Sequence, residues 1–203
     1  MRALLASFAV LVVFAARVEP HTLDEYLQAT RIDITQTRIV VDLALTPGVA
    51  VASKVFAMVD GDGDGRVSPQ EIQAYAGRLL RDLALRVDGQ PHSLTLTRAE
   101  CPPWDEIRDG AGTIRLQAAA EVSLTPLRRH RIHYENMHDT AAGVYLVNAL
   151  TPSTRAIAIA AQHRDALQRR IDLDVDVSTS SAAVYWFVLS VVGLTAISMR
   201  LRA

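Results

Sequence analysis

The stretch "ATRIDITQTRIVVDLALTP", residues 29–47, indicates how this chain folds. Apolar and polar residues alternate in "RIDIT" and again in "RIVVDLAL", which is the pattern of strands that bury one face. Gln36 and Thr37 lie between the two runs, where a turn is expected. The stretch therefore predicts two neighbouring β-strands, each with one apolar face.

Similar short runs follow along the chain, and turn residues separate most of them. In "LALRVDGQPHSLTLTRAE", residues 83–100, Asp88 and Gly89 lie between two alternating runs and indicate a hairpin. Short strands at this spacing predict a mainly β fold, an antiparallel β-sandwich of the immunoglobulin-like (Ig-like) kind. The other candidate strands are "GTIRLQAAAEVSL" (112–124), "RRHRIHYENMH" (128–138), "GVYLVNAL" (143–150), "AIAIAAQH" (156–163) and "RRIDLDVDV" (169–177).

A helix–loop–helix insertion interrupts the β pattern at about residues 51–84. Residues 51–59, "VASKVFAMV", predict a short first helix. Ser68 is a suitable N-cap for the second helix, Pro69 suits its first turn, and Glu71 stands three residues after the cap. The positions predicted to share an apolar face are Val51, Val55 and Val59 in the first helix, and Ile72, Tyr75, Ala76, Leu79, Leu80 and Leu83 in the second.

The twelve residues "DGDGDGRVSPQE", 60–71, match the loop of an EF-hand. Such a loop places oxygen ligands at positions 1, 3 and 5, a backbone carbonyl at 7, often a water at 9, and a bidentate glutamate at 12. Gly65 occupies position 6, where the chain must turn sharply, and Val67 supplies an apolar side chain at position 8. We therefore predict a Ca²⁺ site. Its ligand positions are Asp60, Asp62, Asp64, Arg66 through its carbonyl, Ser68 through a water, and Glu71.

A simpler interpretation of the same residues is an acidic turn, in which Glu71 only completes a capping box with Ser68. That interpretation leaves the alternating aspartates unexplained, because converging carboxylates repel one another without a cation. Only one such loop occurs in the sequence. We expect the weak affinity of extracellular calcium modules, roughly 0.1–1 mM, and hence a structural site rather than a signalling switch.

The N-terminal residues, "MRALLASFAVLVVFAAR", have the pattern of an export signal. Arg2 provides a basic start, and the apolar run from Ala3 to Ala16 is short for a transmembrane helix. Residues 1–20 are therefore predicted to be a signal peptide or, if they are not removed, an N-terminal anchor.

The C-terminal residues predict a single membrane span. Residues 182–199 carry no charge, and as a helix they would be about 27 Å long, close to the thickness of the bilayer core. Residues 178–181 form a polar linker, and the arginines in residues 200–203 favour a cytoplasmic tail. Residues 21–177 are then predicted to be an extracytoplasmic domain, where calcium is abundant.

Composition narrows the classes of function. Half of the residues are hydrophobic and the formal net charge is -1, which excludes a disordered chain and offers no basic field for nucleic acid. Cys101 is the only cysteine, so no intramolecular disulfide can form, and we expect it to pack beside Pro102 and Pro103. No motif of a nucleophilic, nucleotide-binding or zinc-hydrolase site occurs, so we expect no enzyme.

Several segments together resemble a family of exported bacterial proteins with a β-rich extracytoplasmic domain and one EF-hand-like loop. Besides the loop they are "HTLDEYLQAT" (21–30), "LTPGVAV" (45–51), "GTIRLQ" (112–117) and "VYLVNALTPS" (144–153). The family is similar to the extracytoplasmic parts of HupE/UreJ-type membrane proteins, which are linked to nickel or cobalt transport. The resemblance implies a location at the bacterial inner membrane, with the domain facing the periplasm or cell exterior and a permease as a possible partner. With one C-terminal span the chain would have no translocation pathway of its own.

The alternative function is handling of nickel, cobalt or copper for such a permease. Six histidines are present, and a site that combines His21 with a distant histidine remains open. His130 and His133 are three residues apart, so on one strand they face opposite sides and do not readily share an ion. The surrounding "RRHR", residues 128–131, is predicted to be a charged strand edge that discourages pairing with other strands.

Overall fold

The computed structural model describes residues 24–179. The signal or anchor predicted for residues 1–20, the span predicted for 182–199 and the tail predicted for 200–203 lie outside the described residues, as do two residues of the predicted linker. Among the described residues, no helix is both long enough and apolar enough to cross a membrane.

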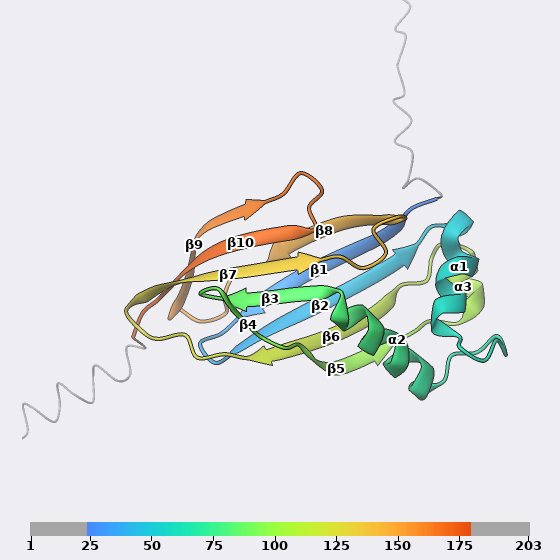
Figure 1. Ribbon diagram of the computed structural model, residues 1–203, viewed down its shortest axis with the longest axis horizontal. Coiled ribbons are helices and arrows are strands. Elements are labelled where there is room, and N and C mark those ends of the chain that lie inside the picture. Colours follow the sequence, from blue (N-terminus) through green and yellow to red (C-terminus); the bar gives the residue numbers. More distant parts are fainter. Residues whose placement is uncertain (1–23, 180–203) are drawn as a thin grey trace, which may run out of the picture.

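The described chain is mainly β, as the sequence predicts, and its strands form two five-stranded sheets that face one another (Figure 1). Sheet A has the strand order β5 (Thr95–Glu100), β6 (Ile114–Glu121), β2 (Arg38–Pro47), β1 (Tyr26–Ile34) and β8 (Gly143–Ala149). Sheet B has the order β4 (Gln90–Pro91), β3 (Leu83–Val87), β7 (Arg128–Asn136), β10 (Arg170–Val177) and β9 (Ile157–Arg164).

The first two strands confirm the prediction for residues 29–47. β1 and β2 pair antiparallel over their whole length, and Ile34 opposite Ile39 closes the hairpin. Buried and partly exposed residues alternate along both strands, because successive side chains point to opposite faces of a sheet. The inward side chains belong to the core between the sheets.

One strand pair departs from the predicted antiparallel arrangement. β8 pairs with β1 in the parallel direction, with Tyr26 opposite Gly143 and Ile32 opposite Ala149, whereas the other strand pairs of the described chain are antiparallel. A parallel pair needs a long connection rather than a tight turn. Here β8 follows β7 of sheet B, and crossing to sheet A lets it run beside β1 in the same direction.

The predicted Asp88–Gly89 turn is confirmed, but the run after it changes sheets. Asp88 and Gly89 have φ values of 51° and 82°, as a two-residue hairpin turn of the type I′ kind requires. The hairpin ends after Pro91, since β4 has only two residues. One further backbone hydrogen bond follows, from the His92 N–H to the Leu85 carbonyl at 2.9 Å. The chain then crosses to sheet A, where β5 pairs with β6.

The "RRHR" segment, residues 128–131, was predicted to be a charged strand edge, and in the structure it pairs with another strand on one side only. It begins β7, which is a central strand of sheet B, but β3 pairs only with residues 132–136, so residues 128–131 have β10 as their one strand partner. Its outward positive charges face a row of aspartates on β10, which neutralises them. The cross-strand pairs of this segment are Arg129–Asp176 at 2.7 Å and Arg131–Asp174 at 3.5 Å.

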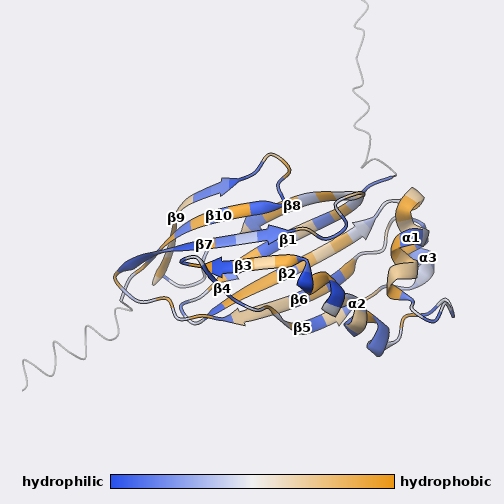
Figure 2. Ribbon diagram, viewed as in Figure 1, coloured by the Kyte–Doolittle hydropathy of each residue, from blue (hydrophilic) through white to orange (hydrophobic). Residues whose placement is uncertain are grey.

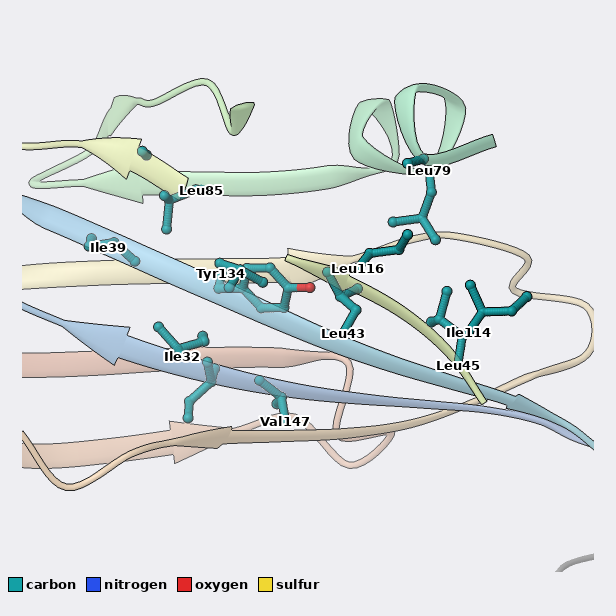
Figure 3. Close-up of a cluster of buried hydrophobic side chains, with 14 of the residues drawn as sticks. Ile32, Ile39, Leu43, Leu45, Leu79, Leu85, Ile114, Leu116, Tyr134 and Val147 are labelled. Atoms are coloured by element: carbon teal, nitrogen blue, oxygen red, sulfur yellow. The ribbon is translucent and has the colours of Figure 1, made fainter. Parts of the chain in front are cut away.

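The core lies between the two sheets and extends under the helices at one end of the sandwich (Figures 1 and 3). Figure 3 shows Ile32 and Leu43 of sheet A, Tyr134 of sheet B and Leu79 of a helix directed into this space. The helices are α1 (Val49–Val59), α2 (Pro69–Arg81) and the short α3 (Trp104–Arg108). Ile107 of α3 is fully buried, and the ring of Phe56 in α1 packs at a tilt against Trp104, with ring centroids 4.7 Å apart.

Candidate metal site

The predicted helix–loop–helix is present at residues 49–81, close to the predicted range of 51–84. α1 ends at Val59 with Asp60 as its C-cap, and α2 begins at Pro69 with Ser68 as its N-cap. The Ser68 hydroxyl accepts a hydrogen bond from the Glu71 N–H, and the Glu71 carboxylate accepts one from the Ser68 N–H, which is the predicted capping box.

Both helices hold the loop through their buried faces. Figure 2 shows mainly apolar residues along α1, with one hydrophilic stretch, and both hydrophilic and apolar residues along α2. The Arg78 guanidinium of α2 donates a hydrogen bond to the Met58 carbonyl in the last turn of α1, which fastens the two helices beside the loop. The residues of the predicted apolar faces that are buried are Val55 and Val59 in α1, and Ile72, Tyr75, Ala76 and Leu79 in α2; Val51, Leu80 and Leu83 are only partly buried.

The structure brings three of the predicted ligands together. One carboxylate oxygen from each of Asp60, Asp62 and Glu71 lies within 4.8 Å of the others. Asp60 is 7% exposed, whereas Asp62 lies in solvent and Glu71 is partly buried. The loop therefore collects negative charge from both of its ends at one point, although Glu71 is eleven residues from Asp60 in sequence.

Backbone N–H groups of the loop hold these carboxylates in place. Asp60 accepts from the N–H of Gly63 and of Gly65, both at 2.9 Å. Glu71 accepts from the Gly61 N–H at 2.8 Å and the Asp62 N–H at 3.2 Å. These bonds draw the two ends of the loop toward each other.

Hydrogen bonds also keep Glu71 ionised. The Ser68 N–H and hydroxyl, together with the N–H groups of Asp62 and Gly61, lower the pKa of Glu71 to about 2 because they stabilise its charged form. At neutral pH this side chain is therefore a carboxylate, as a cation ligand must be.

The other predicted ligands make contacts within the loop. Asp64 is not in the converging group; its Oδ1 accepts from the Arg66 N–H at 2.7 Å, and its own N–H donates to Asp62. The Ser68 hydroxyl donates to Glu71 Oε2 at 2.8 Å. Arg66 was predicted to contribute its carbonyl, and its side chain is exposed.

The glycines give the loop its sharp path. Gly63 and Gly65 have φ values of +74° and +82°, in the left-handed region that L side chains rarely adopt. Gly65 is the glycine predicted at position 6 of the loop. This path aims the N–H groups of both glycines at the Asp60 carboxylate.

The chemistry of this arrangement suits a hard cation. Carboxylate oxygens, with backbone carbonyls and water, are the ligands that Ca²⁺ takes in flexible loops. Carboxylates this close repel one another, and a divalent cation between them would remove that repulsion. The residues present therefore fit such an ion.

A buried polar network that sequence reasoning missed lies next to the site. The hydroxyls of Tyr26 and Tyr75 are 2.6 Å apart, and the Tyr75 hydroxyl lies 3.3 Å from His138 Nε2. His138 Nδ1 in turn lies 2.8 Å from Asp82 Oδ2. Tyr75 stands one helical turn after Glu71, so the network anchors the same face of α2 to β1 and to the loop after β7.

Side-chain amides extend this network toward sheet A. Gln28 of β1 is fully buried; it donates to the His138 carbonyl and accepts from the Asn136 side chain, each at 2.9 Å. The only sign of this network in the sequence is the presence of polar residues at inward positions of β1 and β7. Their partners could not be found without the fold.

The structure also bears on the predictions made for Cys101 and the histidines. Cys101 is partly buried against the core, and burial raises the pKa of its thiol to about 11, which leaves it protonated and unreactive at neutral pH. His130 is buried and His133 faces outward, as their spacing predicts. His21 lies outside the described residues.

No protein-family model matches this chain, and a search of curated proteins gives no match. The ligand of the loop is therefore inferred from the loop's own residues and geometry.

Proposed function

We propose that the domain is a calcium-stabilised, extracytoplasmic binding or accessory domain with a single structural EF-hand site. The observation that carries this proposal is the convergence of Asp60, Asp62 and Glu71 across a loop that joins two helices. The remaining ligands would come from Asp64, the Arg66 carbonyl and a water at Ser68. The resemblance to exported bacterial EF-hand proteins supports the same function.

The ion would stabilise the helix pair and not act as a switch. Asp60 and Glu71 belong to opposite ends of the loop, so an ion shared between them ties α1 to α2. With an affinity of roughly 0.1–1 mM, about 1 mM calcium adds roughly 0.4–1.4 kcal/mol to the free energy of unfolding. That gain is suited to a compartment where calcium is constantly high.

The sandwich itself supports a binding role, because its strand order fits the Ig-like kind. β1, β2, β6 and β5 correspond to strands A, B, E and D of that fold, and β3, β7 and β10 correspond to C, F and G. β8 and β9 are then additions between F and G. Ig-like sandwiches commonly bind partners through the loops at their ends.

We further propose that the domain is attached to the bacterial inner membrane by the segment at residues 182–199 and faces the periplasm or cell exterior. The apolar composition of that segment and the basic residues after it support this location. A membrane protein such as a nickel or cobalt permease is the partner that the resemblance implies.

The test is thermal unfolding of the full-length chain in 1 mM calcium and in chelator. We expect calcium to raise the Tm by about 1–5 °C, because that is the shift that the gain in free energy of unfolding given above produces in a chain of this length. Asp60→Ala and Glu71→Gln should remove the gain. Glu106→Gln changes an exposed carboxylate outside the loop and should keep it.

A second variant separates metal binding from helix capping. Ser68→Ala removes the cap and should cost about 1 kcal/mol in calcium and in chelator alike, while most of the calcium gain remains. Glu71→Gln keeps a hydrogen-bond acceptor for the cap but loses the charge. If the wild-type melting curves in calcium and in chelator superimpose, the proposed function is wrong.

A further inference from the structure

Three potential metal ligands form a row across the outer face of sheet B. His133 of β7 lies directly opposite Asp172 of β10, and Asp172 lies directly opposite His163 of β9. The three residues are 30 and 9 positions apart in sequence, so only the strand register brings them together. This row lies apart from the EF-hand loop and plays no part in the proposed calcium function.

The alternation of side chains places all three residues on the same outward face. Ile132 and Tyr134, on either side of His133, are fully buried, and so are Ile171 and Leu173 on either side of Asp172. Their neighbours His133 and Asp172 must therefore point away from the core.

Side chains on β9, an edge strand of sheet B, also point alternately inward and outward near His163. Arg164 is exposed, and its guanidinium reaches toward sheet A, where it donates to the Val147 carbonyl at 2.7 Å. The preceding residue, His163, therefore points outward beside Asp172, and it is exposed. Among the residues described, the three helices gather at one end of the sandwich and leave this part of the face open (Figure 1).

Two of the three ligands are already close enough to share an ion. His133 Nδ1 lies 2.8 Å from Asp172 Oδ1. Two ligands of a tetrahedral ion, each bonded at about 2.0–2.2 Å, stand about 3.3–3.6 Å apart, so replacing the shared proton by a metal needs an opening of less than about 1 Å. His163 completes the site by a side-chain rotation, since its ligand atom does not yet lie within 4.8 Å of the other two.

We propose that His133, Asp172 and His163 bind one borderline divalent transition-metal ion such as Zn²⁺. Two imidazoles and one carboxylate suit this class of ion, whereas Ca²⁺ takes only oxygen ligands. Three protein ligands leave a coordination position open on a solvent-exposed face. The site is a surface site of modest affinity, because Arg170 lies 3.8 Å from the other oxygen of Asp172 and adds a positive charge.

The test is calorimetric titration of the full-length chain with Zn²⁺ at pH 7.5, after treatment with chelator. We expect one zinc ion per chain, with His163→Ala and Asp172→Asn each weakening binding about tenfold or more. His92→Ala is the matched control, because His92 is a partly exposed histidine outside the row, and this variant should bind zinc like the wild type. Asp60→Ala should also leave zinc binding unchanged, which separates this site from the calcium loop.

A spectroscopic measurement identifies the ligands directly. Cu²⁺ bound to the wild type should show hyperfine coupling to two imidazole nitrogens in electron paramagnetic resonance, and to one nitrogen in His163→Ala. His163 is exposed at the sheet edge, so this variant should keep the wild-type circular dichroism spectrum. Unchanged zinc affinity in a folded His163→Ala, or no zinc binding by the wild type below about 1 mM, would overturn the proposal.

Discussion

At the scale of single residues, the loop depends on glycines as much as on carboxylates. Gly65 has a φ of +82°, and a Cβ added there would meet no atom within 4 Å. A side chain at this position would have room, and only the left-handed backbone conformation makes it unfavourable. Gly77, inside α2, also has open space around its missing Cβ, but its φ is not positive. The two glycines form a natural pair for comparison.

Alanine at these two positions should have opposite effects on stability. Gly65→Ala should lower the free energy of unfolding by about 1–2 kcal/mol, because an L residue is strained in the left-handed region. Gly77→Ala should raise it by about 0.5–1 kcal/mol, because alanine is the better helix former. Urea unfolding of the two variants measures both changes, and a stabilised Gly65→Ala would contradict the loop conformation.

At the scale of elements, α2 connects the loop to the two sheets. Its first turn carries Ser68 and Glu71 at the loop, and its next turn carries Tyr75 in the buried polar network. Burial raises the pKa of Tyr75 to about 12, so its hydroxyl stays protonated and can donate at any ordinary pH. The position of Glu71 is thus set partly by contacts that α2 makes far inside the protein.

Tyr75→Phe should destabilise the domain by about 1–3 kcal/mol. The change keeps the ring but leaves the Tyr26 hydroxyl and His138 Nε2 without this partner in a buried place. A double-mutant cycle with Tyr26→Phe, followed by urea unfolding, should give a coupling energy that differs from zero. Additive effects of the two changes would show that the two hydroxyls do not interact.

At the scale of the whole molecule, charge pairing on sheet B contributes to stability in a pH-dependent way. Although burial opposes ionisation of Asp88, hydrogen bonds from the Arg131 N–H and the His130 imidazole lower the pKa of its carboxyl. The hydrogen bond from Arg129 likewise lowers the pKa of Asp176. A carboxyl with a lowered pKa in the folded state stabilises the protein above its unfolded pKa, here 3.8, and loses that effect as pH falls through the folded value.

Asp88→Asn should therefore lower stability at pH 7 more than at pH 2.5. We expect a loss of about 1 kcal/mol at pH 7, where the charged hydrogen bonds of Asp88 are replaced by neutral ones. At pH 2.5 the difference should shrink, because the wild-type carboxyl is then becoming protonated. Thermal unfolding of both proteins across this pH range measures the effect. An equal loss at both pH values would show that the charge of Asp88 is not involved.

Local patterns in the sequence predict most strands, because alternation and turn residues are local properties. The hairpin of residues 29–47 and the Asp88–Gly89 turn are found where they were expected. So are the capping box at Ser68 and the helices on either side of the loop. Three of the ligand positions, Asp60, Asp62 and Glu71, converge as the loop pattern predicts.

Strand partners could not be predicted, since they depend on contacts between distant residues. The charged start of β7 has the composition of a protected edge, and only the fold shows that β10 pairs with one side of it while β3 pairs further along, with residues 132–136. Similarly, the sequence spacing of His130 and His133 gave no clue that His133 would stand in register with His163 across β10. The parallel partner of β1 lies more than a hundred residues away.

That parallel partner also determines how the domain responds to mechanical tension. The described chain enters β1 at one end of the sandwich and leaves β10 at the other (Figure 1). β1 is held on one side by β2 and on the other by β8. A pull between the two ends acts along β1, so both hydrogen-bond ladders bear the load at once in shear rather than opening one bond at a time. A domain tethered at one end and drawn by a partner at the other would thus resist force through its first strand.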